Sequence, residues 1–283
     1  MNIYDVQLVL GLSLCFPLCK WTLDHSLFAY ISETLIPAPS LHDQKNRSSQ
    51  QLKPPSAENA GKNKLLLRKI NEALWKLSCY GLFVLIGSLN TLRSEWFWRT
   101  KAYWQGWPHQ EGMQPLRYQC ALELSYYVSG VAMLLFEVSR KDQAMMMVHH
   151  CATIVLTGAC YWYNYARAGC VIMLIHDIND VLMEVAKLCS YMKRETLAKV
   201  AFGLFVVCWM ALRMVMFPTV IIRSTMFEVV EVLGYQPPMY WLINSLFVLL
   251  YCIHVYWFTL ILRILWSVLV TGSGKDVREE EDE

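Results

Sequence analysis

Long apolar stretches alternate with shorter polar connections along most of this 283-residue chain. A helix of about 20 mainly apolar residues is long enough to cross the hydrocarbon core of a bilayer. Seven stretches approach or exceed this length, and we predict a membrane-spanning helix in each. They cover residues 5–38, 70–92, 118–137, 144–163, 168–191, 199–220 and 240–265. The predicted fold is therefore an all-α, polytopic membrane helical bundle.

The first of these spans has the weakest pattern. Lys20, Asp24 and His25 interrupt its apolar run, and Pro17 is expected to kink the helix. The segment has neither a basic start nor a small-residue cleavage site, so we interpret residues 1–38 as a retained membrane anchor rather than a removed signal peptide.

The remaining organisation follows from changes in composition. Residues 39–64 are rich in Ser, Asn, Gln, Lys and Pro and are predicted to form a flexible loop. The other six spans form one helical unit over residues 65–265. Residues 266–283 form a tail that ends in the acidic run KDVREEEDE, which is typical of a solvated chain end.

Composition supports a membrane protein and excludes some other classes. Hydrophobic residues make up 55% of the chain and the mean hydropathy is +0.31, which is too apolar for a soluble domain. The net charge of +2 gives no sign of nucleic-acid binding. The ten cysteines lie in or beside apolar runs without metal-binding spacing, so we interpret them as small buried hydrophobic residues.

Loop charge predicts the orientation. Fifteen Lys and Arg residues fall in the connections on one side, which are residues 39–69, 138–143, 192–199 and 263–283, and six fall in the alternate connections. The positive-inside rule places the first set in the cytosol, so the N-terminus is lumenal or external and the C-terminus cytosolic. The sequon at Asn46 would then be cytosolic and unused.

The opposite loop, residues 93–117, contains a cluster of aromatic residues. We interpret this cluster as an anchor at the membrane interface. Its members are Trp96, Phe97, Trp98, Tyr103, Trp104 and Trp107.

Ionisable residues inside the spans are the main candidates for a functional site. A charged group at the centre of a membrane helix costs about 2.5–3.5 kcal/mol on insertion scales, so such residues usually face a polar cavity. His149 and His150 lie near the start of the fourth span. The fifth span carries a stripe at helical spacing, formed by His176, Asp177, Asp180, Glu184 and Lys187.

The stripe must face the interior of the bundle, and it needs a counter-ion there. Arg213 lies in the sixth span and is predicted to pair with one of the two aspartates, because an unpaired arginine at that depth is too costly. We expect the histidine pair and the stripe to line one cavity that opens to the cytosol.

Two other readings of these residues stay open at this point. The first is a buried polar network that only holds helices together. The second is a metal site, although adjacent histidines point about 100° apart on a helix and suit one ion poorly. We predict no metal.

The order and spacing of these residues resemble a known family. The run RKDQAMMMVHHCATIVL at 140–156, followed by NYARAGCVIMLIHDINDVLMEVAKLCSY at 164–191, resembles the Lag motif of ceramide synthases in the TLC-domain superfamily. KINEALWKLSCYG at 69–81 and RMVMFP at 213–218 resemble flanking parts of the same domain. Gln143 departs from the aromatic residue expected after Arg-Lys-Asp, and the chain has no homeobox-like insertion.

The resemblance implies a six-helix TLC catalytic core over about 65–265 and an enzyme of the endoplasmic reticulum membrane. Such an enzyme transfers a fatty acyl group from acyl-CoA to the amine of a sphingoid base, of the sphinganine or phytosphingosine type. It also implies catalytic roles for His149, His150, Asp177 and Asp180. Supporting roles fall to His176, Glu184, Lys187, Arg213, Asn164 and Arg167.

Elementary chemistry agrees with this implication. A thioester is already activated, so no ATP site is needed and no cofactor is expected beyond acyl-CoA as co-substrate. Histidine is suited to remove the amine proton, or to attack the thioester first and form an acyl-imidazole. We favour His149 for this role, and both routes stay open. Acyl-chain length, which the loop at 221–239 influences in the family, is not readable here.

Other functions are compatible with parts of the pattern. A non-catalytic TLC-type lipid sensor or scaffold explains the fold but not the full His and Asp set. A transporter or proton relay explains buried ionisable groups, yet predicts inverted repeats or broken helices that the sequence does not show clearly. Expected partners are acyl-CoA, a sphingoid base and membrane lipids, with a homodimer, a heterodimer or a small regulatory subunit left open.

Overall fold

The computed structural model describes residues 3–35, 57–134, 136 and 141–271, and every regular element among them is a helix. The predicted sequon at Asn46 and the acidic run at 275–283 lie outside the described residues. The helices are α1 (Ile3–Asp24), α2 (Leu27–Leu35), α4 (Ala57–Thr91), η1 (Thr100–Tyr103), α5 (Gln114–Leu134), α6 (Gln143–Trp162), α7 (Ala166–Tyr191), α8 (Glu195–Cys208), η2 (Trp209–Ile222), η3 (Ser224–Glu228), α9 (Val229–Leu233) and α10 (Tyr240–Thr271).

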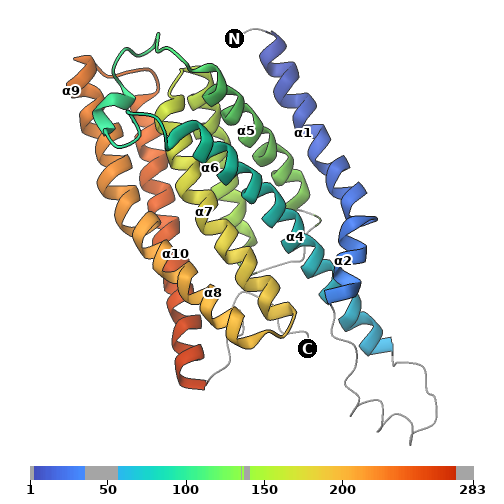
Figure 1. Ribbon diagram of the computed structural model, residues 1–283. Coiled ribbons are helices and arrows are strands. Elements are labelled where there is room, and N and C mark those ends of the chain that lie inside the picture. Colours follow the sequence, from blue (N-terminus) through green and yellow to red (C-terminus); the bar gives the residue numbers. More distant parts are fainter. Residues whose placement is uncertain (1–2, 36–56, 135, 137–140, 272–283) are drawn as a thin grey trace, which may run out of the picture.

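The long helices run roughly side by side in alternating directions (Figure 1). The chain passes along the bundle through α1 and α2, α4, α5, α6, α7, the rod from α8 to α9, and α10. The start of α1 and the end of α10 therefore lie at opposite ends of the bundle (Figure 1). The predicted all-α polytopic bundle is confirmed.

Five of the described helical segments are long and apolar enough to span a membrane by themselves. They are Asp5–Asp24, Gly61–Thr91, Gln143–Trp162, Glu195–Leu233 and Tyr240–Val270. Helices α5 and α7 are not among them, although they run alongside the others (Figure 1). Both carry polar residues that they bury inside the bundle, including Glu123 on α5 and Asp177 on α7.

Two of the predicted N-terminal boundaries are wrong. The first span is not one helix, because a turn at His25 and Ser26 separates α1 from α2. Helix α1 continues through Pro17, and the break in the first span lies eight residues after this proline. The loop predicted at 39–64 also ends early, because α4 already begins at Ala57.

The sixth span is longer than predicted. Helical structure runs from Glu195 to Leu233 without interruption, so most of the loop predicted at 221–239 is helical. The rod ends at Gly234, whose φ of 78° is the left-handed conformation in which glycine commonly closes a helix. Pro218 lies inside the π-helical segment η2, where the Arg223 N–H reaches back five residues to the Pro218 carbonyl.

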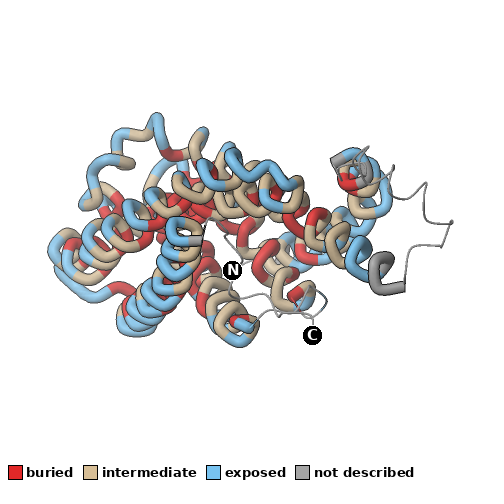
Figure 2. Tube along the Cα trace, turned by 90° about the horizontal axis from the view of Figure 1, so that it is seen from below, coloured by how far each residue is buried: buried red, intermediate tan, exposed pale blue. Residues whose placement is uncertain are grey.

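Burial follows the arrangement of the bundle. The tube in Figure 2 shows buried positions turned inward and exposed positions on the outer faces. Many exposed side chains are large and apolar, as expected for lipid-facing helices; Leu14, Trp241 and Trp266 are about 70% exposed. Of the ten free cysteines, Cys79, Cys120 and Cys170 are buried, whereas Cys15, Cys19, Cys151 and Cys252 are exposed on these outer faces, contrary to prediction.

The aromatic loop between α4 and α5 is more than an interfacial anchor. Trp104 is buried and its indole N–H donates to Ser224 Oγ of η3 at 2.9 Å. Trp107 donates to the Tyr163 carbonyl at 2.8 Å and stacks on Tyr165. Trp98 remains 79% exposed. The loop therefore closes one end of the bundle, and simple anchoring describes Trp98 only.

Asn164 and Arg167 help to hold this loop in place. Asn164 has a φ of 63°, which asparagine tolerates, and its amide donates to the Pro108 carbonyl at 2.5 Å. Arg167 donates to the Ala102 carbonyl at 2.8 Å. Tyr103, in the same loop, donates its hydroxyl to the Phe97 carbonyl at 3.0 Å, and burial raises its pKa to about 12.

The contact between α6 and α7 leaves no room for a side chain at Gly169. A Cβ there would lie 2.7 Å from Cys160 Sγ and 3.0 Å from its Cβ, whereas a Cβ at Gly158 on α6 would meet nothing within 4 Å. We expect Gly169→Ala to lower the free energy of unfolding by about 1–3 kcal/mol through overpacking. Gly158→Ala is the matched control and should be neutral or slightly stabilising. Thermal unfolding of both variants in detergent measures the difference, and equal stability would contradict the close contact.

Candidate active site

His149 lies on α6 at a cavity inside the bundle. The cavity is lined by Tyr127, His149, Thr153, Leu156, Thr157, Cys160, Gly169, Ile172, Met173, His176, Phe247 and Leu250. The Nδ1 atom of His149 is buried and has no hydrogen-bond partner among the described residues. The ring meets Trp257 edge-on at a centroid distance of 5.2 Å. One ring nitrogen of this histidine is therefore uncommitted beside a mostly apolar cavity.

His176, on α7, lines the same cavity but both of its ring nitrogens have partners. Nδ1 lies 2.7 Å from the Ile172 carbonyl oxygen, and Nε2 lies 3.2 Å from Nε2 of His254 on α10. His254 is completely buried. His254 was not among the residues predicted from the sequence, although it is an ionisable residue inside the apolar span 240–265 and so met the criterion that identified the other candidates.

His150 takes a different direction from its neighbour, although both belong to α6. Its Nδ1 lies 2.8 Å from the Met146 carbonyl, and its ring meets Tyr127 of α5 at 5.6 Å. A Cβ on Gly130 of α5 would lie 3.3 Å from its Cδ2 atom. His150 therefore packs against α5, while His149 faces α10 and the cavity.

Arg213 forms the predicted ion pair with an aspartate of the stripe. Its NH2 group donates to Asp180 Oδ1 at 2.6 Å and to the His176 carbonyl at 3.0 Å. The side chains are 4% and 14% exposed, so the pair is largely withdrawn from solvent. The guanidinium also lies 4.3 Å from the centre of the Trp209 ring. The prediction of a counter-ion is confirmed, and Asp180 is the partner.

Asp177 lies in another environment from Asp180. It is 1% exposed, and its Oδ2 atom has no hydrogen-bond partner among the described residues. Glu123 and Tyr127, both on α5, are among the residues that interact electrostatically with Asp177. Glu123 is fully buried and accepts a hydrogen bond from Gln119 at 3.0 Å. Sequence reasoning missed this second buried carboxyl group, which lies within the predicted span 118–137.

The remaining supporting residues lie farther along the bundle. Glu184 Oε1 accepts a hydrogen bond from Lys187 at 2.8 Å one turn away on α7, whereas its buried Oε2 atom has no hydrogen-bond partner among the described residues. Asn164 and Arg167 brace the closing loop at the end of α6, about 21 Å from His150 at 1.5 Å per residue. The residues of the fifth-span stripe therefore contact several different neighbours and do not line a single wall of the cavity. Of its members, only His176 lines the cavity with His149.

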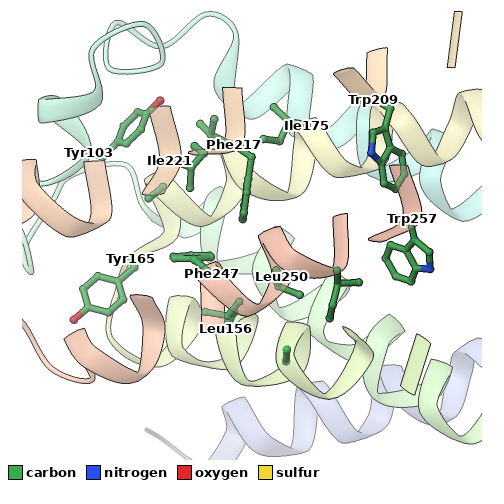
Figure 3. Close-up of a cluster of buried hydrophobic side chains, with 14 of the residues drawn as sticks. Tyr103, Leu156, Tyr165, Ile175, Trp209, Phe217, Ile221, Phe247, Leu250 and Trp257 are labelled. Carbon is green, nitrogen blue, oxygen red and sulfur yellow. The ribbon is translucent and has the colours of Figure 1, made fainter. Parts of the chain in front are cut away.

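A second cavity continues the first toward the closed end of the bundle. Leu156, Cys160, Gly169, Ile172 and Phe247 line both. The second cavity ends among Trp104, Tyr165, Pro237, Pro238 and Tyr240. Figure 3 shows Phe247 and Leu250 of α10 facing Leu156 of α6 along this path. The two cavities therefore adjoin along a mainly apolar path, which we call the corridor, with His149 and His176 at one end.

Aromatic rings enclose the histidine end of the corridor. Phe217 lies edge-on to both His176 and His254, at 5.4 and 5.1 Å. Trp257 is fixed by a hydrogen bond from its indole N–H to Asp142 Oδ2 at 3.0 Å, and Figure 3 places it beside Trp209. No group of three or more His, Cys, Asp or Glu in the described part of the chain is arranged to hold a metal ion.

The amino-acid sequence is similar to those of known proteins. A profile of the TLC domain matches residues 69–263. Ceramide synthase LOH2 of Arabidopsis thaliana is 31% identical over 290 aligned residues, which cover 100% of this chain and 94% of the relative. Ceramide synthase 5 of Homo sapiens is 34% identical over 224 residues, or 76% of this chain and 57% of the relative.

The chain belongs to the ceramide synthase family of TLC-domain proteins. The resemblance seen in the motifs is thereby confirmed, and with it the enzyme class, an acyltransferase. ASC1-like protein 1 of rice, 35% identical over 76% of this chain, is a further relative.

Removing the carboxylate of Asp180 leaves Arg213 without its buried counter-charge. We expect Asp180→Asn to destabilise the protein by about 3–5 kcal/mol, because breaking one half of a buried ion pair leaves the other half uncompensated. Glu231→Gln breaks the exposed pair with Lys101 and serves as the control, with an expected loss below about 1 kcal/mol. Thermal unfolding in detergent compares the two. A loss no larger for Asp180→Asn than for the control would contradict a stabilising role.

Proposed function

We propose that this enzyme transfers a fatty acyl group from acyl-CoA to the amine of a sphingoid base, with His149 as the nucleophile. The observation that carries the proposal is the position of His149. It borders the corridor, and its buried Nδ1 atom has no hydrogen-bond partner among the described residues. His176 is a poorer candidate because both of its nitrogens have partners. His150 is a poorer candidate because it does not line the corridor.

The corridor suits a long acyl chain. Its lining is mainly apolar from Leu156 to Trp104, so a chain lying there would be removed from water. The thioester carbonyl would then lie at the histidine end. A site enclosed by aromatic rings also keeps water from an acylated histidine.

The reaction proceeds in two steps in this proposal. A neutral ring nitrogen of His149 attacks the thioester carbon, the C–S bond breaks, and CoA leaves as a thiolate. The sphingoid amine then attacks the acyl-imidazole, the amide bond forms, and the bond to His149 breaks. The proton that the amine loses balances the protonation of the CoA thiolate. The alternative is direct transfer in which His149 only removes the amine proton.

Asp177 and Asp180 have different roles in this proposal. Asp180 is committed to Arg213 and positions α7 against η2. The buried Oδ2 atom of Asp177 has no hydrogen-bond partner among the described residues, and Asp177 interacts electrostatically with Tyr127, which lines the corridor. We assign to Asp177 the stabilisation of positive charge on the attacking amine, which a carboxylate favours and an amide does not.

The proposed setting is the endoplasmic reticulum membrane, with the N-terminus lumenal and the C-terminus cytosolic. The charge asymmetry of fifteen to six supports this orientation. Contacts join the loop after α4 to the α6–α7 turn and to η3, so connections with few basic residues gather at one end of the bundle. Arg68 and Phe136 lie at or beside the connections that are rich in basic residues. The Arg68 side chain donates a hydrogen bond to the Phe136 carbonyl at a different place in the bundle.

A test of the reaction uses purified full-length protein with acyl-CoA and sphinganine. We expect mass spectrometry to detect the N-acyl product together with free CoA. His149→Ala should lose at least about 10²–10⁴-fold in rate while keeping its thermal stability. His109→Gln, at an exposed histidine outside the site, is the control. Intact-mass analysis after acyl-CoA alone should find an acyl adduct that is absent from His149→Ala. Product formation without any adduct would favour direct transfer.

The assignment of the aspartates predicts a separation of activity from stability. Asp177→Asn should lose most of its turnover and unfold at close to the wild-type temperature, whereas Asp180→Asn should be clearly less stable. Initial rates and thermal unfolding of the two variants give the comparison. An active Asp177→Asn variant would remove this residue from the chemistry.

The orientation can be checked in sealed microsomes. A tag at the C-terminus should be digested by added protease, and a tag at the N-terminus should be protected, because only the former faces the cytosol. Asn46 should carry no glycan. A glycan at Asn46, or the reverse protection pattern, would contradict the orientation.

A further inference from the structure

His254 is placed behind the histidines that border the corridor. It comes from α10, has no exposed surface, and does not itself line the corridor. Its Nε2 atom lies 3.2 Å from Nε2 of His176, and its ring centre lies 6.5 Å from that of His149. It therefore contacts His176 and lies near His149 without lining the space that a substrate would fill.

The hydrogen bonds fix the positions of the protons in this group. A carbonyl oxygen only accepts, so the His176 Nδ1 atom facing the Ile172 carbonyl carries a hydrogen. Neutral His176 then has a lone pair on Nε2 and accepts a hydrogen bond from Nε2–H of His254. Neutral His254 is left with a lone pair on Nδ1. This atom is buried and has no hydrogen-bond partner among the described residues.

We propose that His254 is a positioning residue that holds His176 in one tautomer and temporarily takes up the proton that His149 releases. This inference rests on the proposed function of His149. The distance between the two rings can be closed by one bridging water or a small ring rotation. Because His254 acts through its neighbours, substrate contact is not required of it.

Proton uptake and release by His254 has a function in each half-reaction. When one nitrogen of His149 bonds to the acyl carbon, its other nitrogen must lose a proton, and Nδ1 of His254 accepts it. His254 can in turn pass its Nε2 proton to Nε2 of His176. When the amine attacks, the proton returns to His149, which then leaves as neutral imidazole instead of an anion. The amine's own proton balances that taken up by the CoA thiolate.

The groups facing His254 decide how its charge is tolerated. They are His149 from α6, His176 from α7 and Arg213 from η2, with the rings of Trp209 and Phe217 around them. Its main electrostatic neighbours among the described residues are these three basic groups, and the charge of Arg213 is paired with Asp180. A protonated His254 is therefore stabilised only by sharing its proton, which suits a short-lived carrier better than a permanent cation.

The test compares His254→Gln with wild type in the N-acylation assay across pH. Glutamine keeps an N–H donor near the position of Nε2 but has no titratable nitrogen. We expect kcat to fall about 10²-fold with KM for both substrates within twofold, and the acid side of the pH profile to change. His109→Gln should match wild type. A His254→Gln variant within twofold of wild-type kcat and with an unchanged pH profile would overturn the proposal.

Two further measurements keep the result interpretable. If His254→Gln does not fold, His254→Asn replaces it, and the same limits apply. The rate of wild-type enzyme is also measured in mixtures of H2O and D2O. A curved dependence on deuterium content indicates more than one proton in transfer, as the proposal requires, and a linear or absent dependence counts against it. Wild type that forms no amide at all would instead contradict the proposed function.

Discussion

The ion pair between Arg213 and Asp180 is the interaction on which the arrangement of the site depends. A guanidinium inside a membrane bundle is tolerated only beside a counter-charge, and here the carboxylate comes from a different helix. The same NH2 group also binds the His176 carbonyl, so the pair sets the distance between η2 and α7 at the level of the histidines. The wide π-helical backbone of η2 carries Arg213 at this point, and such segments often occur at functional sites.

With α7 held in this way, the residues of its polar face have different roles. Asp180 holds α7 to η2 through Arg213, and Glu184 pairs with Lys187 through one of its two carboxylate oxygens. His176 points into the corridor and to His254, whereas Asp177 keeps an unpaired oxygen near α5. A polar stripe on a membrane helix therefore need not act as a unit, because each residue meets a different neighbour around the helix.

The apolar half of the site depends on the opposite end of the bundle. Trp104, Trp107 and Tyr165 close the corridor through packing and through hydrogen bonds to Ser224, the Tyr163 carbonyl and the Pro238 carbonyl. Aromatic residues that bury one side and donate from the other are suited to such a closure. This end therefore limits how far the corridor extends along the bundle from the histidines.

The sequence by itself determined the all-α bundle, the bounds of α5, α6 and α7 to within four residues, and most of the ionisable candidates, because apolar length and the cost of buried charge are local properties. It could not determine which residues meet. His254 and Glu123 are isolated ionisable residues in apolar runs of the sequence. The packing of the helices brings them to the site. The adjacent pair His149 and His150 was separated by the rotation of about 100° between neighbouring helical residues, which directs one ring to α10 and the other to α5. Partner choice across helices, and the corridor between them, depend on contacts distant in sequence, so tertiary structure alone decided them.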